Sequence, residues 1–396
     1  MKVDLSVYKK EAENEMDDIL SYWIKYSIDR EYGGFYGKID NKNHSFPDSP
    51  KGSVLNSRIL WAFSAVYNLT KKPEYILTAK RAYDYIFNHF FDDEYGGVYW
   101  SVDYKGKMLN GRKQIYGLAF CIYGLSEYYK ASGDKTILGA GIDLFKEIEQ
   151  YSFDEKRKGY YEAFNRDWKP LADLRLSEKD ANEKKTTNTH LHIIEAYANL
   201  YEVWPDQFLK SQIENLLEVF LKYMINSETG HLNLFFDEEW NEKTDIISYG
   251  HDIEAAWLLQ RCAEKINHHK LIEETKEAAI KITNAVTEGL DADGGLWYEF
   301  DANENRLIRE KHSWPQAEAM IGFMNAYQIT NDQKYLEKSL NSWEFIKRHI
   351  KDTENGEWFW GVNADNSIMQ GQDKAGFWKC PYHNTRACLE IIDRIQ

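Results

Sequence analysis

A glycine turn flanked by aromatic residues recurs six times along the chain, and no other feature constrains the fold as strongly. Successive copies lie 61 to 71 residues apart and share an acid-x-x-(Gly)-Gly-aromatic pattern, which is the signature of a repeat architecture. We expect the glycine to adopt a positive φ and the aromatic residues after it to form a short strand. The copies are DREYGGFY at Gly34, DDEYGGVYW at Gly97, DEKRKGYYEAF at Gly159, SETGHLNLFF at Gly230, DADGGLWYEF at Gly295 and DTENGEWFWGV at Gly356.

The chain between two turns has room for two helices of different character. The segment before a turn is amphipathic, which predicts an outer helix. In residues 211–224, for example, apolar Ile213, Leu216, Leu217, Phe220 and Met224 recur every three or four residues, opposite Glu214, Glu218 and Lys222. The segment after a turn is apolar nearly all round, which predicts a buried inner helix. These inner segments are residues 57–69, 114–125, 189–200, 251–260, 314–327 and 383–392.

Alternating inner and outer helices predict the whole architecture. Six of each, joined in one direction around a ring, make an all-α (α/α)6 barrel with short β-turns or hairpins between the helices. No Pro- or Ser-rich linker interrupts the repeat, so we expect one domain over residues 1–396. The longest insert, residues 165–187, is polar, and we expect it to form a loop at the mouth of the barrel.

Charge and composition exclude several classes of partner. The net charge is −15 and no dense Lys/Arg block is present, so nucleic acid and anionic membranes are excluded as partners. No long apolar run or secretory signal is evident, and Cys121, Cys262, Cys380 and Cys388 lack zinc or redox spacing. We expect a cytoplasmic protein with reduced, mostly buried thiols, either a monomer or a weak homodimer, with a structural disulfide as the weaker alternative.

Candidate site residues gather in the first turns of the inner helices. Inner helices of such a barrel begin at the same end, so their first turns converge on one cavity. Five of the eleven histidines fall there. The unusual residues at these positions are Arg58, Tyr116, His190, His192, His251, Glu254, His312, Trp314, Glu318, Trp378, His383 and Arg386. A single histidine of this kind can be a packing residue, but recurrence at equivalent positions favours a site.

His190 and His192 cannot both face the cavity, because residues two apart point about 200° apart on a helix. We favour His192, since His192-x-x-Glu195 repeats the spacing of His251-x-x-Glu254. In each pair the glutamate, one turn later, can fix the tautomer of its histidine. The two pairs can also hold a metal in the manner of a reversed di-iron motif. No Asp/Glu-rich bridging set accompanies them, so we expect no metal.

The residue types around the expected cavity suit a sugar. The chain has 13 Trp, 27 Tyr and 19 Phe, and aromatic faces stack on the C–H faces of pyranose rings while His, Arg and Glu bind hydroxyls. Phosphate-binding glycine motifs, serine nucleophile elbows and zincin motifs are absent from the sequence.

Five motifs together resemble the N-acylglucosamine 2-epimerase superfamily, and within it the cellobiose 2-epimerases, over essentially the full length. They are SVLNSRILWAFS, TNTHLHIIEAY, YGHDIEAAWLL, KHSWPQAEAM and FWKCPYHNTRA. The resemblance implies an (α/α)6 barrel and cofactor-independent epimerisation at C2 of a reducing-end sugar, with a disaccharide as substrate. The last motif looks like the cellobiose-type version. No nucleotide-binding feature is present, which also argues against the nucleotide-dependent N-acylglucosamine type.

The resemblance also implies roles for particular residues. It places the catalytic histidines at His251 and His383, and it places Arg58 and His192 on the reaction intermediate. We take His383 as the base at C2 and His251, oriented by Glu254, for ring opening and proton return, although the two roles can be exchanged. The sugar-contacting positions are Tyr116, Asn188, Glu254, Trp314 and Trp378, to which we add Glu318 from the Trp314 motif.

The chemistry of C2 inversion agrees with these residue types. Opening the hemiacetal gives an aldehyde that acidifies the C2 hydrogen, and imidazole is a suitable base. The resulting enediolate needs fixed donors, for which Arg58 and His192 are available. Three alternatives remain: mannose isomerisation or N-acylmannosamine epimerisation through a related intermediate, a glycoside hydrolase using carboxylates among Asp180, Glu254 and Glu318, and a sugar-binding protein without catalysis.

Overall fold

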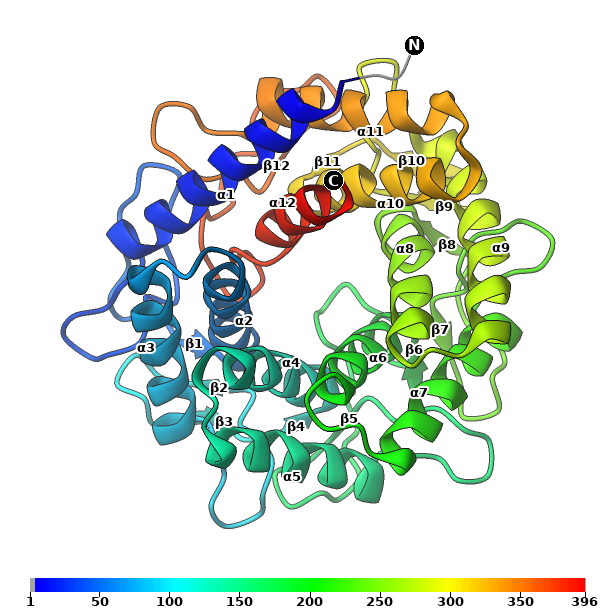
Figure 1. Ribbon diagram of the computed structural model, residues 1–396. Coiled ribbons are helices and arrows are strands. Elements are labelled where there is room, and N and C mark those ends of the chain that lie inside the picture. Colours follow the sequence, from blue (N-terminus) through cyan, green and yellow to red (C-terminus); the bar gives the residue numbers. More distant parts are fainter. Residues whose placement is uncertain (1–3, 396) are drawn as a thin grey trace.

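The computed structural model describes residues 4–395, which form twelve α-helices in two concentric rings (Figure 1). The inner ring consists of α2 (Ser53–Thr70), α4 (Ile115–Ser132), α6 (Thr187–Tyr201), α8 (Tyr249–Lys265), α10 (Ser313–Thr330) and α12 (His383–Arg394). The outer ring consists of α1 (Ser6–Tyr26), α3 (Pro73–His89), α5 (Lys135–Tyr151), α7 (Gln207–Val219), α9 (His269–Val286) and α11 (Gln333–Phe345). The predicted (α/α)6 barrel is confirmed.

The two rings differ in burial as the sequence pattern predicts. Every residue of α4 from Ile115 to Tyr128 is buried, because a helix that is apolar all round leaves no face for water. The outer helix α7 continues as a π-helical turn over Phe220–Met224. Along this helix Leu217 is buried, whereas Glu218 is exposed. Consecutive inner helices pack side by side, and α12 returns to α2 to close the ring.

The recurring glycine turns reverse the chain between an outer helix and the next inner helix. Across each turn a single β-bridge joins the two flanking segments, as between Phe91 and Val98. Gly97 has a φ of 67°, and positive φ holds at five of the six glycines named above. Gly295 is the exception: its neighbour Gly294 adopts the positive φ, while Gly295 packs closely against Lys311 and Phe345.

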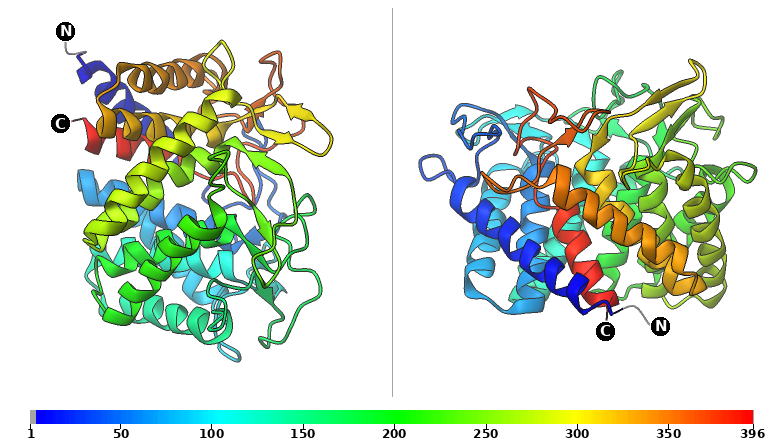
Figure 2. Two further views of the ribbon diagram at one scale, coloured as in Figure 1. Left: turned by 90° about the vertical axis from the view of Figure 1, so that its right-hand side faces the viewer. Right: turned by 90° about the horizontal axis from the view of Figure 1, so that it is seen from above.

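Short antiparallel strands gather with the long loops at one end of the barrel, and both termini lie at the other (Figure 2). A strand of two or three residues precedes five of the inner helices and pairs with the strand that follows the next glycine turn. Before α12 the equivalent contact is a bridge between Ala375 and Ile39, which joins the two ends of the chain. The strands are β1 (Lys51–Gly52), β2 (Ser101–Val102), β3 (Met108–Asn110), β4 (Lys113–Gln114), β5 (Ala163–Phe164), β6 (Lys185–Thr186), β7 (Phe235–Phe236), β8 (Ile246–Ser248), β9 (Glu299–Asp301), β10 (Arg306–Ile308), β11 (Lys311–His312) and β12 (Gly361–Val362).

A buried ion pair explains why the repeated turn begins with an acid. A lysine on the segment that leads to an inner helix reaches back to the aspartate of the preceding turn, as where Lys51 Nζ lies 2.7 Å from Asp29 Oδ2. In the fourth repeat Asn226 stands at the acid position and Ile247 at the lysine position. The pairs are Lys51–Asp29, Lys113–Asp92, Lys185–Asp154, Lys311–Asp291 and Lys374–Asp352, and all are buried on both sides except the Lys311 pair, whose Asp291 side chain is 32% exposed.

The polar insert and the cysteines agree with the sequence analysis. Between β5 and β6 the insert forms the expected loop over the barrel mouth, although its last residues, 185–187, belong to β6 and α6. All four cysteines are buried free thiols. Within residues 4–395 no helix is both long enough and apolar enough to cross a membrane.

Candidate active site

A cavity of about 690 Å³ opens at the strand-bearing end of the barrel. The first turns of the inner helices line its floor, as expected from helices that begin at the same end, and residues 174–181 of the insert form part of its wall. Nine of the ten residues expected from the sequence lie in the lining: Arg58, Tyr116, Asn188, His192, His251, Glu254, Trp314, Trp378 and His383. Glu318 is not part of the lining.

The two neighbouring histidines of α6 have separate roles, as their spacing predicts. His190 is fully buried and points away from the cavity; its Nδ1 lies 2.7 Å from the carbonyl oxygen of Thr186, and its Nε2 accepts the backbone N–H of Tyr160. His192 lines the cavity and holds its Nδ1 3.0 Å from Glu195 Oε2. The predicted pairing of His192 with Glu195 is therefore confirmed.

His251 is oriented by a hydroxyl rather than by Glu254. Its Nδ1 lies 2.8 Å from the Oγ of Ser248, the residue that precedes α8, while Glu254 Oε1 accepts an N–H from Arg386 Nη2. The expected His251–Glu254 pairing is therefore wrong, because a buried guanidinium satisfies that carboxylate. Burial lowers the pKa of His251 to about 4, with the charge of Glu254 opposing the shift, so its imidazole is neutral at pH 7.

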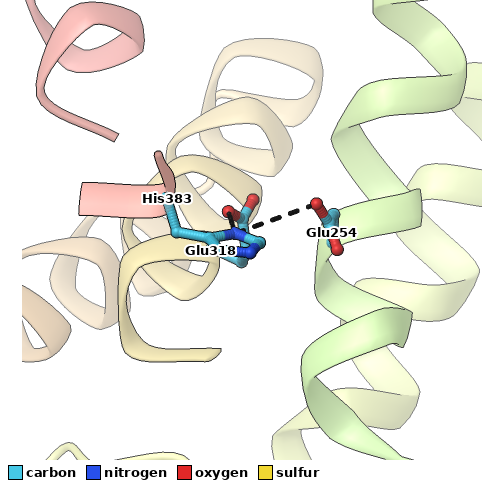
Figure 3. A group of neighbouring side chains, drawn as sticks. All are labelled: Glu254, Glu318 and His383. Carbon is cyan, nitrogen blue, oxygen red and sulfur yellow. Dashed lines mark hydrogen bonds and ion pairs between the residues drawn. The ribbon is translucent and has the colours of Figure 1, made fainter. Parts of the chain in front are cut away.

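His383 is the first residue of α12 and lies between two glutamates (Figure 3). Its Nδ1 is 2.7 Å from Glu318 Oε1 and 4.0 Å from Glu254 Oε1. Because a carboxylate accepts a hydrogen bond, Nδ1 carries the proton and Nε2 is left as the basic nitrogen. Burial lowers the pKa of His383 well below its usual range, and the positive charges of Arg386 and Arg58 act in the same direction.

Glu318 takes a different place from the one expected. Its carboxylate is fully buried behind His383, and it also accepts the indole N–H of Trp257 at 3.0 Å. Burial raises the pKa of Glu318, while its hydrogen bonds to Arg386 and Trp257 oppose that rise. Glu318 therefore lies behind His383 and does not line the cavity, in contrast to the expectation that it contacts a sugar directly.

Two half-buried tryptophans offer flat apolar surfaces among these polar groups. The Trp314 ring contacts two histidines, with its centroid 4.9 Å from that of His251 and 5.5 Å from that of His383. Trp378 lies across the cavity floor beside Tyr116, at a centroid separation of 5.9 Å. Rings placed in this way can stack on the C–H face of a pyranose.

Arg58 is a buried cation with no carboxylate partner among residues 4–395. Its Nη2 donates to the Tyr116 hydroxyl at 2.7 Å, and its Nη1 donates to the Trp378 carbonyl oxygen at 3.3 Å. The guanidinium carbon lies 4.2 Å from the Phe120 ring centroid. No carboxylate in the described part of the chain forms an ion pair with Arg58, so its charge is available to an anion that forms in the cavity.

Arg386 is the main residue that the sequence analysis left without a role. It lies one turn after His383 on α12, and its guanidinium donates to Glu195, Glu254 and Glu318 as well as to the Tyr382 hydroxyl. Glu254, Glu318 and His383 have possible ligand atoms within 4.8 Å of one another, but Arg386 already balances both of these carboxylates. The position of Arg386 in a first turn was visible in the sequence, whereas its three partners come from other helices.

Further lining residues lie outside the helices, in segments for which helical periodicity makes no prediction. His312 lies at the rim, where its ring stacks on Tyr298 at 3.9 Å between centroids and its Nε2 is 2.9 Å from Glu310. Glu162 also lines the cavity and accepts the Thr189 hydroxyl at 2.6 Å, and burial raises its pKa to about 8. His312 was among the first-turn residues named from the sequence, whereas Glu162 was not, and the polarity of the insert was the sequence signal for residues 174–181.

The cavity combines the imidazoles of His192, His251 and His383, a guanidinium without a carboxylate partner among the described residues and two aromatic rings, while the imidazole of His312 lines it beside Glu310. Neutral imidazoles can remove and return a proton, and the guanidinium can stabilise an oxyanion. Such a set suits proton transfer at a carbon next to a carbonyl group, on a ligand with apolar faces and many hydroxyls.

Comparison with known proteins agrees with this chemistry. The profile of the N-acylglucosamine 2-epimerase (GlcNAc 2-epimerase) family matches residues 33–387. A cellobiose 2-epimerase from Bacteroides fragilis is 47% identical over 387 residues, which cover 98% of this chain and 99% of that protein. The solved structure of cellobiose 2-epimerase from Bacillus thermoamylovorans superimposes with a TM-score of 0.94 at 39% identity, covering 98% and 99% of the two chains.

A more distant relative, the N-acylglucosamine 2-epimerase of Mus musculus, is 23% identical over 407 residues, covering 99% of this chain and 92% of that protein. The matches to the cellobiose enzymes and to this relative all span nearly the whole barrel, including every first turn that contributes to the cavity. The chain belongs to the N-acylglucosamine 2-epimerase family.

Proposed function

We propose that this protein inverts C2 of the reducing-end sugar of a β-1,4-linked disaccharide, converting cellobiose to glucosyl-mannose and acting in the same way on related disaccharides. The observation that carries the proposal is that Arg58, which has no carboxylate partner among the described residues, lines the same cavity as the imidazoles of His192, His251 and His383. An enediolate is the anion that this combination fits, because it forms only after a base removes the hydrogen at C2.

The proposed reaction begins with ring opening, which turns C1 into an aldehyde and makes the C2 hydrogen acidic. His383 then takes that hydrogen on Nε2, while its Nδ1–H stays bonded to Glu318. The electron pair moves into the C1–C2 bond and the charge collects on O1, where Arg58 and His192 donate to it. During ring opening His251 takes the proton of the O1 hydroxyl while O5 takes one from water, and His251 then delivers its proton to the opposite face of C2. The ring closes on the epimer as O5 returns its proton to water and O1 takes the proton held by His383.

Two bases are needed on opposite faces of C2, and the positions of the histidines support this division. His251 on α8 and His383 on α12 come from different helices, and both rings lie next to the Trp314 ring. Of the two, His383 has a buried carboxylate partner, which stabilises the imidazolium that forms when it accepts a proton. His251 has only the Ser248 hydroxyl at the equivalent nitrogen. This difference favours His383 as the base at C2.

A disaccharide is favoured over a single sugar by the size of the cavity and by the relatives. About 690 Å³ lies within the range of pockets that enclose whole small ligands. Identity to the Bacteroides fragilis enzyme is 47%, about twice the 23% shared with the mouse N-acylglucosamine enzyme. In the proposed complex Trp314 and Trp378 stack on the reducing-end sugar, and the second sugar extends toward the mouth past residues 174–181.

The alternative of a glycoside hydrolase fits the carboxylates less well. Glycoside hydrolases need two carboxyl groups that flank the scissile bond, roughly 5–5.5 Å apart in retaining enzymes and roughly 6.5–9.5 Å apart in inverting ones. Here Glu254 and Glu318 have oxygens within 4.8 Å of each other, but both are engaged by Arg386 and Glu318 does not line the cavity, so the two cannot flank a bound sugar. Isomerisation to a ketose shares the enediolate and differs only in return of the proton to C1, so it is expected as a side reaction.

A sugar panel tests the proposal. Cellobiose, lactose, mannobiose, mannose and N-acetylglucosamine are incubated with the purified protein, with and without exhaustive EDTA treatment, and products are identified by NMR. We expect C2 epimers of the disaccharides, faster turnover than with either monosaccharide, and no loss after EDTA. Release of free reducing ends would indicate hydrolysis, and an EDTA-sensitive activity restored by a divalent ion would overturn the metal-free mechanism.

A further inference from the structure

We propose that Arg386 is a positioning residue that holds the cavity-facing imidazoles of His192 and His383 through one buried guanidinium. This inference rests on the proposed function, because it assigns Arg386 to the proton transfer described above. Arg386 is 2% exposed and is not part of the cavity lining, so it acts on a substrate only through the groups it binds.

The guanidinium connects the two histidines through their carboxylate partners. Toward His192, Arg386 Nη1 donates to Glu195, whose other oxygen is 3.0 Å from His192 Nδ1. Toward His383, Arg386 Nη2 lies 2.7 Å from Glu318 Oε1, the same oxygen that faces His383 Nδ1. Each histidine is thus held at Nδ1 by a carboxylate that Arg386 fixes in turn. The planar fork of arginine suits this task, because it can serve two acceptors in fixed directions.

Charge balance gives the arrangement a second effect. One guanidinium faces three buried carboxylates, so the cluster carries excess negative charge that favours a proton on one imidazole during turnover. At the same time the positive charge of Arg386 lies close to His383 and disfavours its protonation in the resting enzyme. Removing this charge should therefore make His383 protonate at a higher pH.

Groups on several helices face His383 and contribute to its electrostatic surroundings. Glu254 on α8 favours its charged form and Glu318 on α10 lies 2.7 Å from its Nδ1, whereas Arg58 on α2 and His192 on α6 oppose the charged form. On its own segment the Tyr382 ring is 4.5 Å from the His383 ring, between centroids. Of these groups, Arg386 is the one that contacts three carboxylates and does not line the cavity. Its replacement therefore tests the positioning of the imidazoles without removing a side chain that can contact the substrate.

The two buried arginines of the site have opposite surroundings. Arg58 lines the cavity and has no carboxylate partner among the described residues, whereas Arg386 has three. A charge that is already balanced cannot serve an enediolate as well as an unpaired one. We therefore expect loss of Arg386 to change the rate and pH dependence of turnover, and loss of Arg58 to weaken the reaction at every pH.

The test compares Arg386→Met and Arg386→Lys with wild type, and Arg394→Lys on the same helix serves as the control. Arg394 binds Glu390 and Asn325, away from the cavity. Thermal unfolding first establishes that each variant is folded. For Arg386→Met we expect kcat to fall by ~10- to 100-fold with KM nearly unchanged, and the acidic limb of the rate profile to move up by about one pH unit or more.

Arg386→Lys keeps the buried charge and loses the fork, so it decides the question if the methionine variant does not fold. We expect it to lower kcat with a smaller shift of the acidic limb than the methionine variant gives. Folded variants with wild-type kcat and pH profile would overturn the proposal, as would a loss confined to KM.

A second measurement does not depend on activity. The ring nitrogens of ¹⁵N-labelled histidines are titrated by NMR in the protein without sugar, with His192→Asn and His383→Asn variants used for assignment. We expect Nδ1–H tautomers at both positions and a higher titration midpoint for His383 in Arg386→Met. Unchanged tautomers and midpoints would overturn the positioning role even if the sugar panel gave no epimer, so the two proposals fail separately.

Discussion

The imidazole of His383 and the carboxylate of Glu318 meet at 2.7 Å, between Nδ1 and Oε1, at the buried side of the cavity. The equivalent nitrogen of His251 meets only a serine hydroxyl. The two histidines proposed to transfer protons thus differ in the hydrogen-bond partner of Nδ1, although burial lowers the pKa of both. A carboxylate behind one imidazole stabilises its charged form once a proton has been taken from a substrate.

The pH dependence of catalysis follows from these shifts. Because the pKa of His251 is lowered from 6.5 to about 4 and that of His383 is also lowered, both imidazoles stay neutral as the pH falls below 6.5. We expect kcat/KM for cellobiose, measured from pH 4 to 9, to have its acidic limb below pH 6.5. An acidic limb at pH 7 or above would show that the catalytic base has a raised pKa.

Replacement of Arg58 by lysine tests whether the guanidinium stabilises the enediolate. Lysine keeps the charge but cannot donate to Tyr116 and Trp378 while also facing O1, so turnover should fall by ~10²-fold or more. The loss should appear at every pH in kcat measurements, with thermal unfolding as the folding control. Activity within a few-fold of wild type would remove Arg58 from the mechanism.

The repeated lysine–aspartate pairs are expected to stabilise the fold. Lys51 and Asp29 have fully buried side chains, so Lys51→Met leaves an uncompensated carboxylate and should cost about 3–5 kcal/mol in urea unfolding. The matched control is Lys80→Met, because Lys80 and Asp84 form an exposed pair that should contribute at most ~1 kcal/mol.

The double variant Lys51→Met/Asp29→Asn completes this comparison. It also removes the charge of the Asp29 carboxylate, which has lost its lysine partner, and should therefore recover part of the stability lost in Lys51→Met. Equal costs for Lys51→Met and Lys80→Met would show that the buried pairs contribute no more than surface pairs.

The fold and much of the cavity floor could be predicted from the sequence because both follow from local periodicity. Apolar segments after each glycine turn gave the inner ring, and helices that begin at one end brought residues such as His192 and Trp314 together. Helix geometry alone also separated His192 from His190.

Pairings between distant helices could not be predicted in this way. The spacing of His251 and Glu254 suggested a pair, but Arg386, 132 residues after Glu254 in the chain, takes that carboxylate. Glu318 was expected to touch a sugar and instead supports His383. Most inner helices have a lysine two residues before their first residue, and this could be read from the sequence. The aspartate that each lysine binds could not, because the pairing depends on how the glycine turn packs against the segment before the helix.

Exchange of the C2 hydrogen with solvent tests the central claim most directly. Wild type and His383→Asn, each shown to be folded by thermal unfolding, are incubated with cellobiose in D₂O, and deuterium at C2 of the reducing-end sugar is followed by NMR. The account predicts deuterium at C2 of both epimers with wild type and none above background with His383→Asn. Incorporation by His383→Asn at a near wild-type rate would contradict it, and His251 or Glu254 would then have to be the base.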